Sequence, residues 1–305
     1  MPAATQMIYD MRLDHLLEGV TFECFAQALA EKQKVVRCVM EDKTYSSEEI
    51  DRIFSASKAE GKSLYYVDEG VLQNIAPDII FTQDVCEVCQ IDTTCTTAAV
   101  EKLPHTPELV PLSPNSLREA FDCALRIADT LGNREAGLRY LSGLQNRIDG
   151  IKHMLQKAEK IPQRVLLLEW IEPIFNCGHW IPHQIACAGG VDQLSRPSGD
   201  SVVLSWEKIR AYDPEVLVVA PCGFHVQRAK EEMHLLQRRP GFETLTAVKE
   251  NKVYLADFDL FTQPSASTLT KGIELLAALF HPDMFKVPDS LKHKYMHWDT
   301  AAIDV

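Results

Sequence analysis

The sequence lacks an apolar stretch of the length that a membrane-spanning helix needs. No run among its 305 residues approaches about 18 to 20 consecutive apolar residues. The opening residues, MPAATQMIYDMRLDHLLEG, contain neither a basic leader nor a continuous apolar segment, so they do not match a signal peptide. We therefore predict a protein that is not membrane-embedded and lies in the cytoplasm, or in the periplasm if the N-terminus is truncated.

Basic residues are outnumbered, because 31 Lys and Arg stand against 43 Asp and Glu, which gives a net charge of -12. Binding to nucleic acid or to an anionic membrane needs a dense basic face, and no Lys/Arg cluster supplies one. The hydrophobic fraction of 46% is ordinary for a globular protein. A chain of this length buries a large core, and we expect two lobes rather than one.

Familiar catalytic motifs are also missing. The sequence contains no G-x-S-x-G, no P-loop, no G-x-G-x-x-G at a strand end and no H-E-x-x-H. The paired carboxylates Glu231 and Glu232 follow Lys230 in a helical stretch, which is typical of a solvated helix face. These absences favour a binding protein over an enzyme, and they leave an enzyme of another class open.

Nine cysteines are present, and their odd number argues against a complete disulfide framework. In a chain without an export signal they predict free thiols or metal ligands in a reducing compartment. Cys86 and Cys89 form a C-x-x-C within TQDVCEVCQIDTTC at 82–95. This pair is either a thiolate pair that binds a metal or a metal-bearing ligand, or a tight turn of two small residues. Zinc needs four ligands, and Cys24, Cys95, Cys222 or His179 could complete a set only if the fold brings them in.

Short strands alternate with helices in both halves of the sequence, which predicts an α/β fold with parallel sheets. One helix is marked by Ser46 and Glu49 at capping-box spacing and ends at Gly61. The predicted strands are Val35–Val39, Asp78–Phe81, Leu109–Leu112, Arg164–Leu168, Glu215–Ala220 and Lys252–Ala256.

The middle of the chain is helical. Apolar residues recur at helical spacing from Asn133 to Lys160, where Pro162 follows, and a helix of that length would be about 40 Å long. We interpret it as a strut between lobes. The predicted organisation is an N-terminal lobe (1–113), a helical segment (114–161), a C-terminal lobe (162–284) and a tail (285–305) with little to pack.

Four loops that follow predicted strands carry the unusual residues. They are TQDVCEVC, EWIEPIFNCGHWIPH with Trp170 and Trp180, PCGFH with Cys222 and His225, and DFDLFTQP with Phe258. In open α/β sheets ligands bind at the carboxyl ends of the strands. One loop precedes the long helix and three follow it, so a cleft between the lobes could gather all four.

The combination of TQDVCEVC, LEWIEPIFNCGHWIP, SWEKIRAYDPEVLVVAPCGF and RRPGF resembles a bacterial family described as cobalamin-binding proteins. That family belongs to the periplasmic-type binding proteins for cobalamin and ferric siderophores, and the resemblance runs from about Pro2 to Met284. It implies two α/β lobes of parallel-type sheet joined by one long interlobe helix, a class III arrangement, with the ligand between them. It also implies a corrinoid or related metal chelate as ligand, and an ABC permease or an intracellular corrinoid-handling protein as partner.

The resemblance assigns ligand contacts by position. They are Thr5, Glu23, Gln83, Asp84, Trp170, Gly178, His179, Trp180, Gly223, Phe224 and Phe258. A transition metal, if one is bound, would meet Cys86, Cys89, Cys222 and His179. The sequence departs from the family pattern where a first strand is apparently missing, at Gln6 and His183 in place of usual glutamates, and at TQPSAS.

For Trp180 and His179 the sequence also allows a purely structural role instead of ligand contact. An exposed Trp180 offers a face to a flat ligand, and an imidazole such as His179 can ligate cobalt or iron axially. Alternatively Trp180 lies in the core and His179 caps a helix. His179 and His183 are one turn apart, a spacing that also occurs without metal. Trp206, inside a helix, is predicted to be core.

Three functions follow from these observations. The first is a binding protein that closes two lobes on a corrinoid or a similar metal chelate. The second is a metal- or corrinoid-handling enzyme, chelatase-like or thiol redox, that uses Cys86, Cys89 and Cys222. The third is a degenerate paralogue that acts through protein–protein contacts, which the departures at Gln6 and His183 would suit.

Overall fold

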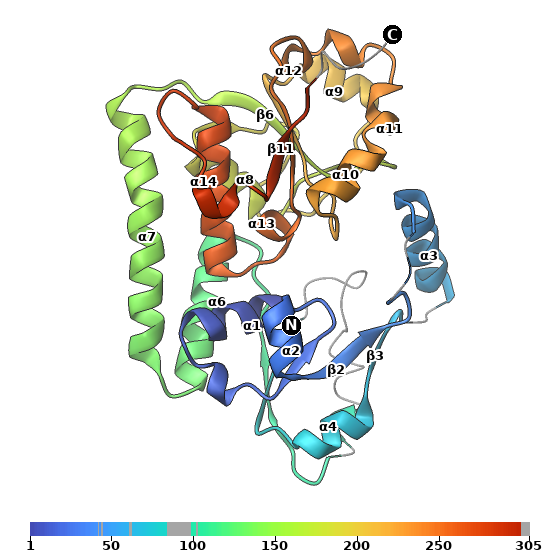
Figure 1. The fold of residues 1–305 in the computed structure, drawn as a ribbon, viewed down its shortest axis with the longest axis vertical. Helices are drawn as coiled ribbons and strands as arrows, with labels where there is room; N and C mark the ends of the chain where they lie inside the picture. The colour runs from blue at the N-terminus through green and yellow to red at the C-terminus, as the bar shows by residue number, and fades with distance from the viewer. Residues whose placement is uncertain (42, 44, 61–62, 84–98, 102, 300–305) are drawn as a thin grey trace. The chain divides into compact units, whose positions relative to one another are not determined.

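The computed structural model describes residues 1–41, 43, 45–60, 63–83, 99–101 and 103–299 (Figure 1). The chain divides into two compact units. Unit 1 comprises Met1–Pro114 and Phe121–Leu141, and unit 2 comprises Asn115–Ala120 and Ser142–Val305. The helical segment predicted at 114–161 is therefore divided between the two units.

Unit 1 contains two small sheets. Strand β1 pairs in parallel with β2, and β2 pairs antiparallel with β3, while β4 and β5 form a separate parallel pair. The strands are β1 (Gly19–Thr21), β2 (Gln33–Cys38), β3 (Tyr65–Val67), β4 (Ile79–Thr82) and β5 (Glu108–Pro111). The helices are α1 (Pro2–Asp10), η1 (Asp14–Leu16), α2 (Ala26–Glu31), α3 (Ser47–Glu60) and α4 (Glu69–Ile75).

Helix α3 begins as its sequence predicts. The backbone N–H of Glu49 donates to Ser46 Oγ at 3.2 Å, and the backbone N–H of Ser46 donates to Glu49 Oε2 at 2.8 Å. This reciprocal pair satisfies two backbone donors that the first turn of a helix leaves without a partner. The capping box predicted from the spacing is confirmed.

Two helices carry the chain between the units: α6 (Leu117–Thr130) and α7 (Arg134–Lys157). The 24 residues of α7 give a length of about 36 Å, close to the predicted strut. Near its start the Tyr140 hydroxyl bonds to Asp10 of α1 at 3.0 Å. Further along, Arg147 makes a two-point ion pair with Glu274 at 2.5 and 2.7 Å. Each end of α7 is thus attached to the unit to which it belongs.

Unit 2 is built on one mixed sheet in the order β11-β10-β9-β6-β7, with β8 beside β6. Strands β6, β8, β9 and β10 are parallel, and β7 and β11 are antiparallel to their neighbours. The strands are β6 (Gln163–Trp170), β7 (Phe175–Asn176), β8 (Gly190–Val191), β9 (Val216–Val219), β10 (Val253–Ala256) and β11 (Tyr295–His297). The parallel sheet predicted for this half of the chain is confirmed.

Helices cover both faces of this sheet (Figure 1). They are α8 (Ile181–Cys187), α9 (Trp206–Tyr212), α10 (Val226–Glu232), α11 (His234–Gln237), η2 (Phe242–Thr244), α12 (Thr246–Lys249), α13 (Asp259–Thr262), α14 (Ala266–Phe280) and η3 (Asp289–Leu291). Alternate strand residues such as Leu166 and Leu217 share one core with Trp206 and Phe242, and the residues between them face the other side. A sheet buried on both faces has near-continuous apolar strands, and all four residues of β9 are buried. Trp206 is core, as predicted.

The tail with little to pack is an expectation that the structure corrects. Strand β11 pairs antiparallel with β10, and Leu291 is only 2% exposed. Met296 and Trp298 pack against the core of unit 2, and the Trp298 backbone N–H donates to the Val253 carbonyl at 2.9 Å. The short apolar stretch that forms β11 has no periodic pattern in the sequence. Its order is explained only by its pairing with the edge of β10.

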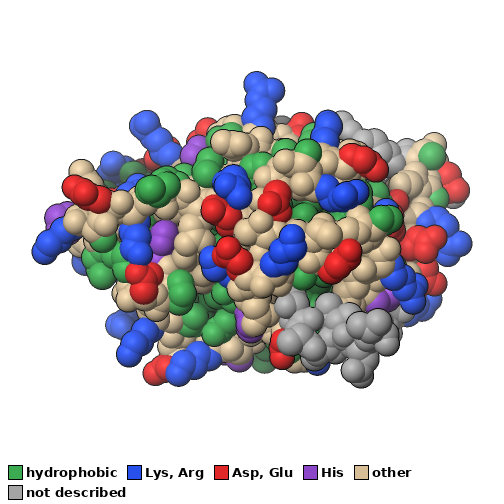
Figure 2. Space-filling view, turned by 90° about the horizontal axis from the view of Figure 1, so that it is seen from above, with side chains coloured by type: hydrophobic (Ala, Val, Ile, Leu, Met, Phe, Trp, Pro, Cys, Tyr) green, Lys and Arg blue, Asp and Glu red, His purple; other side chains and the backbone are tan. Residues whose placement is uncertain are grey.

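No helix in the described part of the chain is both long and apolar enough to cross a membrane. On the face of the molecule shown in Figure 2, the Lys and Arg side chains of the described residues are interspersed with Asp and Glu and form no continuous basic patch. This distribution agrees with the net charge of -12.

Candidate functional site

The carboxyl ends of three adjoining parallel strands of unit 2 carry five of the residues singled out from the sequence: Trp170, Cys222, Gly223, Phe224 and Phe258. Trp170 is the last residue of β6, Phe224 lies in the loop after β9, and Phe258 follows β10. Strand pairing brings these ends together, because β9 lies between β6 and β10. We call Trp170, Cys222, Phe224, His225 and Phe258 the strand-end cluster.

The rings of Trp170 and Phe224 are in contact, with centroids 5.3 Å apart and planes tilted by 53°. Phe224 is buried, at 4% exposure, and the Arg228 guanidinium lies 4.9 Å from its ring centroid. Trp170 is only partly buried and donates its indole N–H to the Glu172 carbonyl at 3.0 Å. The buried Phe224 ring therefore packs beneath the cluster, and the partly buried Trp170 ring is the one of the two that a ligand could contact.

His225 and Phe258 form a second aromatic contact, with ring centroids 5.4 Å apart. The two loops are also joined through the backbone, because the Phe258 N–H donates to the Phe224 carbonyl at 3.1 Å. The side chain of His225 is 67% exposed. This places an exposed imidazole beside the partly buried ring of Phe258.

A buried carboxylate holds this arrangement together. Asp257 Oδ1 accepts the backbone N–H of Val226 at 2.8 Å, and Oδ2 lies 3.1 Å from both His225 Nδ1 and Lys294 Nζ. Burial alone would lower the pKa of Lys294, but the hydrogen bond and charge of Asp259, with those of Asp257, outweigh it and raise the pKa. The lysine therefore stays charged beside the two carboxylates.

Cys222 and Gly223 form the exposed edge of the same loop. Cys222 is exposed, and its backbone N–H donates to the Glu169 carbonyl at 2.9 Å. Gly223 has φ = +80°, a conformation that a side chain rarely adopts, and a Cβ added to it would meet no atom of the described residues within 4 Å. The glycine is therefore required by the backbone turn rather than by a crowded neighbour.

Gly178 and His179 lie against the backbone of residues 199–201, and their predicted contact with a ligand stays a prediction. A Cβ on Gly178 would lie 2.5 Å from the backbone nitrogen of Ser201 and 2.7 Å from the Gly199 carbonyl oxygen. The His179 N–H donates to that same carbonyl at 2.6 Å, with His179 itself at φ = +51°. The glycine thus permits a close approach of the 199–201 backbone.

Trp180 lies in the core of unit 2, at 6% exposure, and donates its indole N–H to the Phe261 carbonyl at 2.5 Å. The expectation of an exposed Trp180 ring does not match this position, whereas the structural alternative does. His179 is partly buried, with its ring 5.5 Å from that of Trp180. Its Nδ1 is buried and has no hydrogen-bond partner among the described residues.

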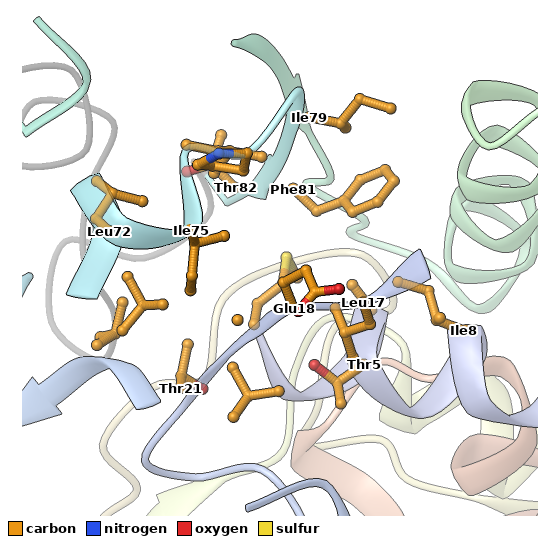
Figure 3. Close-up of a pocket in the computed structure, with 18 of the residues that line it drawn as sticks. Thr5, Ile8, Leu17, Glu18, Thr21, Leu72, Ile75, Ile79, Phe81 and Thr82 are labelled. Carbon is orange, nitrogen blue, oxygen red and sulfur yellow. The ribbon is translucent and has the colours of Figure 1, made fainter. Parts of the chain in front are cut away.

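The residues predicted from the first lobe fall in one place within unit 1. Thr5, Glu23 and Gln83 all line a cavity of about 480 Å³ (Figure 3). Burial of the carboxyl raises the pKa of Glu23 to about 7, partly opposed by the positive chain terminus, although part of this side chain reaches solvent. Asp84, Cys86 and Cys89 lie outside the described residues.

A metal centre does not assemble from the described side chains. Among residues 1–83 and 99–299, apart from the short gaps named above, no group of three His, Cys, Asp or Glu residues is placed to hold a metal ion. Cys222 and His179 are the members of the predicted metal set that the structure describes. The prediction that involves Cys86 and Cys89 stays a prediction.

Reasoning from the sequence missed the residues that support the cluster. His225 is visible in PCGFH beside the chosen Cys222, and its position after a strand was the available indication. Asp257 follows a strand in the same way. Lys294 had no such indication, because it lies in the part of the chain that was expected to be a tail. Arg228 is found only by its contact with Phe224.

The two α/β units, the long helix α7 and the strand-end cluster define a protein of the solute-binding class. A family model described as "Periplasmic binding protein" matches residues 53–260. This match covers more than half of the chain, so the chain belongs to the periplasmic binding protein family. A search of curated proteins found no match.

Solved structures with a similar fold share few residues with this chain. An ABC transporter substrate-binding protein from Listeria monocytogenes EGD-e is 15% identical, with a TM-score of 0.68 over 92% of this chain and 96% of that one. A periplasmic heme-binding protein from Pseudomonas aeruginosa is 16% identical, with a TM-score of 0.68 over 93% and 91%. The periplasmic vitamin B12-binding protein BtuF of Vibrio cholerae is 17% identical, with a TM-score of 0.60 over 92% and 94%. At these identities the likeness establishes the fold.

Proposed function

We propose that this protein binds a flat metal chelate, with a corrinoid such as cobalamin as the first candidate, and that the strand-end cluster of unit 2 forms one of its binding surfaces. The observation that carries the proposal is a pair of ring contacts at adjoining strand ends: the partly buried Trp170 contacts Phe224, and the exposed imidazole of His225 contacts the partly exposed Phe258. Ligands of open α/β sheets bind at such ends.

The chemistry of the cluster suits a chelate with a large planar ligand. Aromatic faces supply apolar contact area to a macrocycle with little loss of side-chain freedom. An imidazole is a common ligand for cobalt and iron. With Nδ1 of His225 directed at Asp257, Nε2 is the nitrogen that would face a metal, and a carboxylate behind a ligating histidine strengthens such a bond. The exposed thiol of Cys222 is a second soft donor on the same loop.

The comparisons support the class of ligand. Solved relatives of this fold are described as binding heme and vitamin B12, both of which are metal-bearing macrocycles. An ABC permease is the partner that the family suggests. Handling of the chelate inside the cell is the alternative that the nine cysteines of the sequence favour. The prediction that the ligand lies between two lobes stays a prediction.

The test is a titration of the reduced protein with cobalamin, cobinamide and hemin, followed by Trp fluorescence and by the absorption bands of the chelates. We expect saturable binding of at least one chelate in the micromolar range or tighter. His225→Ala should abolish the shift of the absorption band that axial ligation produces, and Trp170→Leu should weaken binding by about tenfold through loss of ring contact. Cys222→Ser tests whether the Cys222 thiol contributes to chelate binding.

Matched controls come from the same chain. His153→Ala removes an exposed histidine from α7, and Cys123→Ser replaces a cysteine of α6, so neither should change binding. If no chelate binds the wild type, the proposal is wrong. If a chelate binds equally well to His225→Ala and Trp170→Leu, the strand-end cluster is not its site.

A further inference from the structure

The charged groups around the strand-end cluster contain more carboxylates than cations. Two networks adjoin the aromatic rings, one behind His225 and one beside Phe224, and each holds two carboxylates around a single cation. The charges that surround a binding surface set the electrostatic potential at its ligand and favour a ligand of the opposite sign. The imbalance therefore bears on which chelates this surface accepts.

The first network lies behind His225. Lys294 Nζ lies 3.1 Å from Asp257 Oδ2 and 2.6 Å from Asp259 Oδ2, and Asp257 Oδ2 lies 3.1 Å from the imidazole of His225. The Lys294 carbonyl also accepts the backbone N–H of Asp257 at 2.9 Å, which holds the lysine against both carboxylates. One lysine against two carboxylates leaves one negative charge in excess, directly beneath the imidazole.

The second network lies beside Phe224. The Arg228 guanidinium stands 4.9 Å from the Phe224 ring centroid, with Nη1 2.8 Å from Glu231 and Nη2 2.5 Å from Glu232. These glutamates follow Arg228 by three and four residues and share its face of α10, whereas Lys230, two residues on, is directed to another side of the helix. One arginine against two carboxylates again leaves one negative charge in excess.

The charges near Trp170 do not offset this excess. The indole N–H of Trp170 donates to the Glu172 carbonyl at 3.0 Å, and the Glu172 carboxylate pairs with Arg239, so this ion pair is balanced. Glu169 precedes Trp170 in β6, and its carboxylate accepts from the Ser201 hydroxyl. Among the described residues that make these contacts, no group leaves a positive charge in excess.

Part of the negative charge is shielded from salt by burial. The side chains of Asp257 and Glu232 are 7% and 6% exposed, whereas that of Glu231 is 65% exposed. Ions in solution screen exposed charges strongly and buried charges much less. Burial lowers the pKa of Lys294, yet the carboxylates of Asp259 and Asp257 raise it overall, as a local negative potential does.

We propose that the strand-end cluster, taken as the proposed chelate site, selects a metal chelate with a net positive charge and rejects an anionic one. A cobalt(III) corrinoid with an exchangeable axial water is of the accepted kind, because trivalent cobalt exceeds the single negative charge of the corrin ring. A ferric catecholate, or a heme with ionised carboxylates, is of the rejected kind. Selectivity then comes from repulsion of the anionic competitor as well as from attraction.

The experiment compares two iron(III) porphyrins on the full chain. One carries cationic N-methylpyridinium groups and the other anionic sulfonatophenyl groups, so both offer the same ring and the same metal to the site. Trp fluorescence and porphyrin absorption are followed, and diaquocobinamide serves as the corrinoid probe. We expect the cationic porphyrin to bind at least about tenfold more tightly at about 0.05 M salt, with a smaller difference at about 0.5 M.

Two variants each remove one of the excess charges. Asp259→Asn leaves the pair of Lys294 with Asp257, and Glu231→Gln leaves the pair of Arg228 with Glu232. Each should narrow the preference for the cationic porphyrin about threefold. Glu231 is exposed, so its variant keeps the test decisive even if Asp259→Asn disturbs folding. Glu250→Gln is the matched control, because it changes the net charge equally at the opposite end of β10 and should leave the preference unchanged.

The outcomes separate charge selection from chelate binding itself. If both porphyrins bind equally, or the anionic one binds better, chelate binding stands and charge selection is overturned. If the preference persists unchanged in Glu231→Gln, or is as strong in Trp170→Leu, the cationic porphyrin adsorbs to an acidic protein and the proposal is also overturned. If neither porphyrin nor diaquocobinamide binds, the proposed function fails and charge selection fails with it.

Discussion

The Nδ1 atom of His225 lies 3.1 Å from Oδ2 of Asp257, and this pair joins the start of α10 to the end of β10. The carboxylate side chain is 7% exposed, whereas the imidazole is largely open to solvent. A buried anion thus positions an accessible nitrogen. The same carboxylate accepts from Val226 and Lys294, so its loss would leave several donors without their partner.

Asp257→Ala should lower the free energy of unfolding by about 3 kcal/mol, because removing one member of a buried charged network leaves the other members uncompensated. Urea denaturation measures the effect. Asp289→Ala is the matched control, since the Asp289 side chain is 92% exposed and pairs with Lys292 at the surface. It should leave stability close to that of the wild type, because an exposed ion pair contributes little. Equal losses in the two variants would contradict the anchoring role of Asp257.

Gly178→Ala should lower the free energy of unfolding by about 2 to 4 kcal/mol. Its new Cβ would lie within 2.5 to 2.8 Å of backbone atoms of Gly199, Asp200 and Ser201, and backbone has little room to yield. Gly143→Ala in α7 meets no atom within 4 Å and should instead stabilise by about 0.5 to 1 kcal/mol. Thermal and urea unfolding of Gly178→Ala and Gly143→Ala measure the two changes in stability. A neutral Gly178→Ala would show that the 199–201 backbone is not held against this glycine.

Stability should fall as the pH rises from about 4.5 to about 7, through the carboxyl of Glu23. Its pKa is about 7 in the folded protein against an ordinary 4.5, mainly because of burial. In this window the folded state keeps a proton that the unfolded state has released, so raising the pH favours unfolding. Because part of the side chain reaches solvent, screening reduces the size of the effect. Glu23→Gln should flatten this slope, measured by urea unfolding at pH 5 and pH 8, and Glu18→Gln should leave it unchanged.

Truncation after Pro288 should destabilise unit 2 by several kcal/mol. It removes the buried Leu291, strand β11, Lys294 and the packing of Met296 and Trp298 against the core. It also leaves Asp257 and Asp259 without their lysine. Truncation after Asp299 is the control, because it keeps every one of these contacts. A tail with little to pack would make the two truncations equal.

The predictions that the structure confirms depend on patterns of residues that lie close together in the chain. The alternation of strands and helices, the capping box of Ser46 and Glu49, the long helix near 133–160 and the core position of Trp206 are all present. Each of them follows from periodicity or from a contact between residues close in the chain, and both are readable without a partner element. The family resemblance, at its coarser level, also holds.

Other features depend on a neighbour far along the chain. The exposed Trp180 ring was predicted wrongly, because Trp180 is buried and donates its indole N–H to the Phe261 carbonyl. Gly178 was predicted to lie beside a ligand; the structure shows the backbone of residues 199–201 against it, and the ligand contact stays a prediction. A side chain's exposure is set by which element packs on it, and sequence spacing does not specify that element.

The sequence by itself determined the class of this protein: its helices, its strands and its membership of the periplasmic binding protein family follow from hydrophobic period, turn residues and matching motifs. Only the tertiary structure decided that His225, Asp257 and Lys294 meet at the strand ends. The physical reason is that backbone propensity acts over a few residues, whereas ion pairs, ring contacts and strand edges depend on which distant segments the sheets bring side by side.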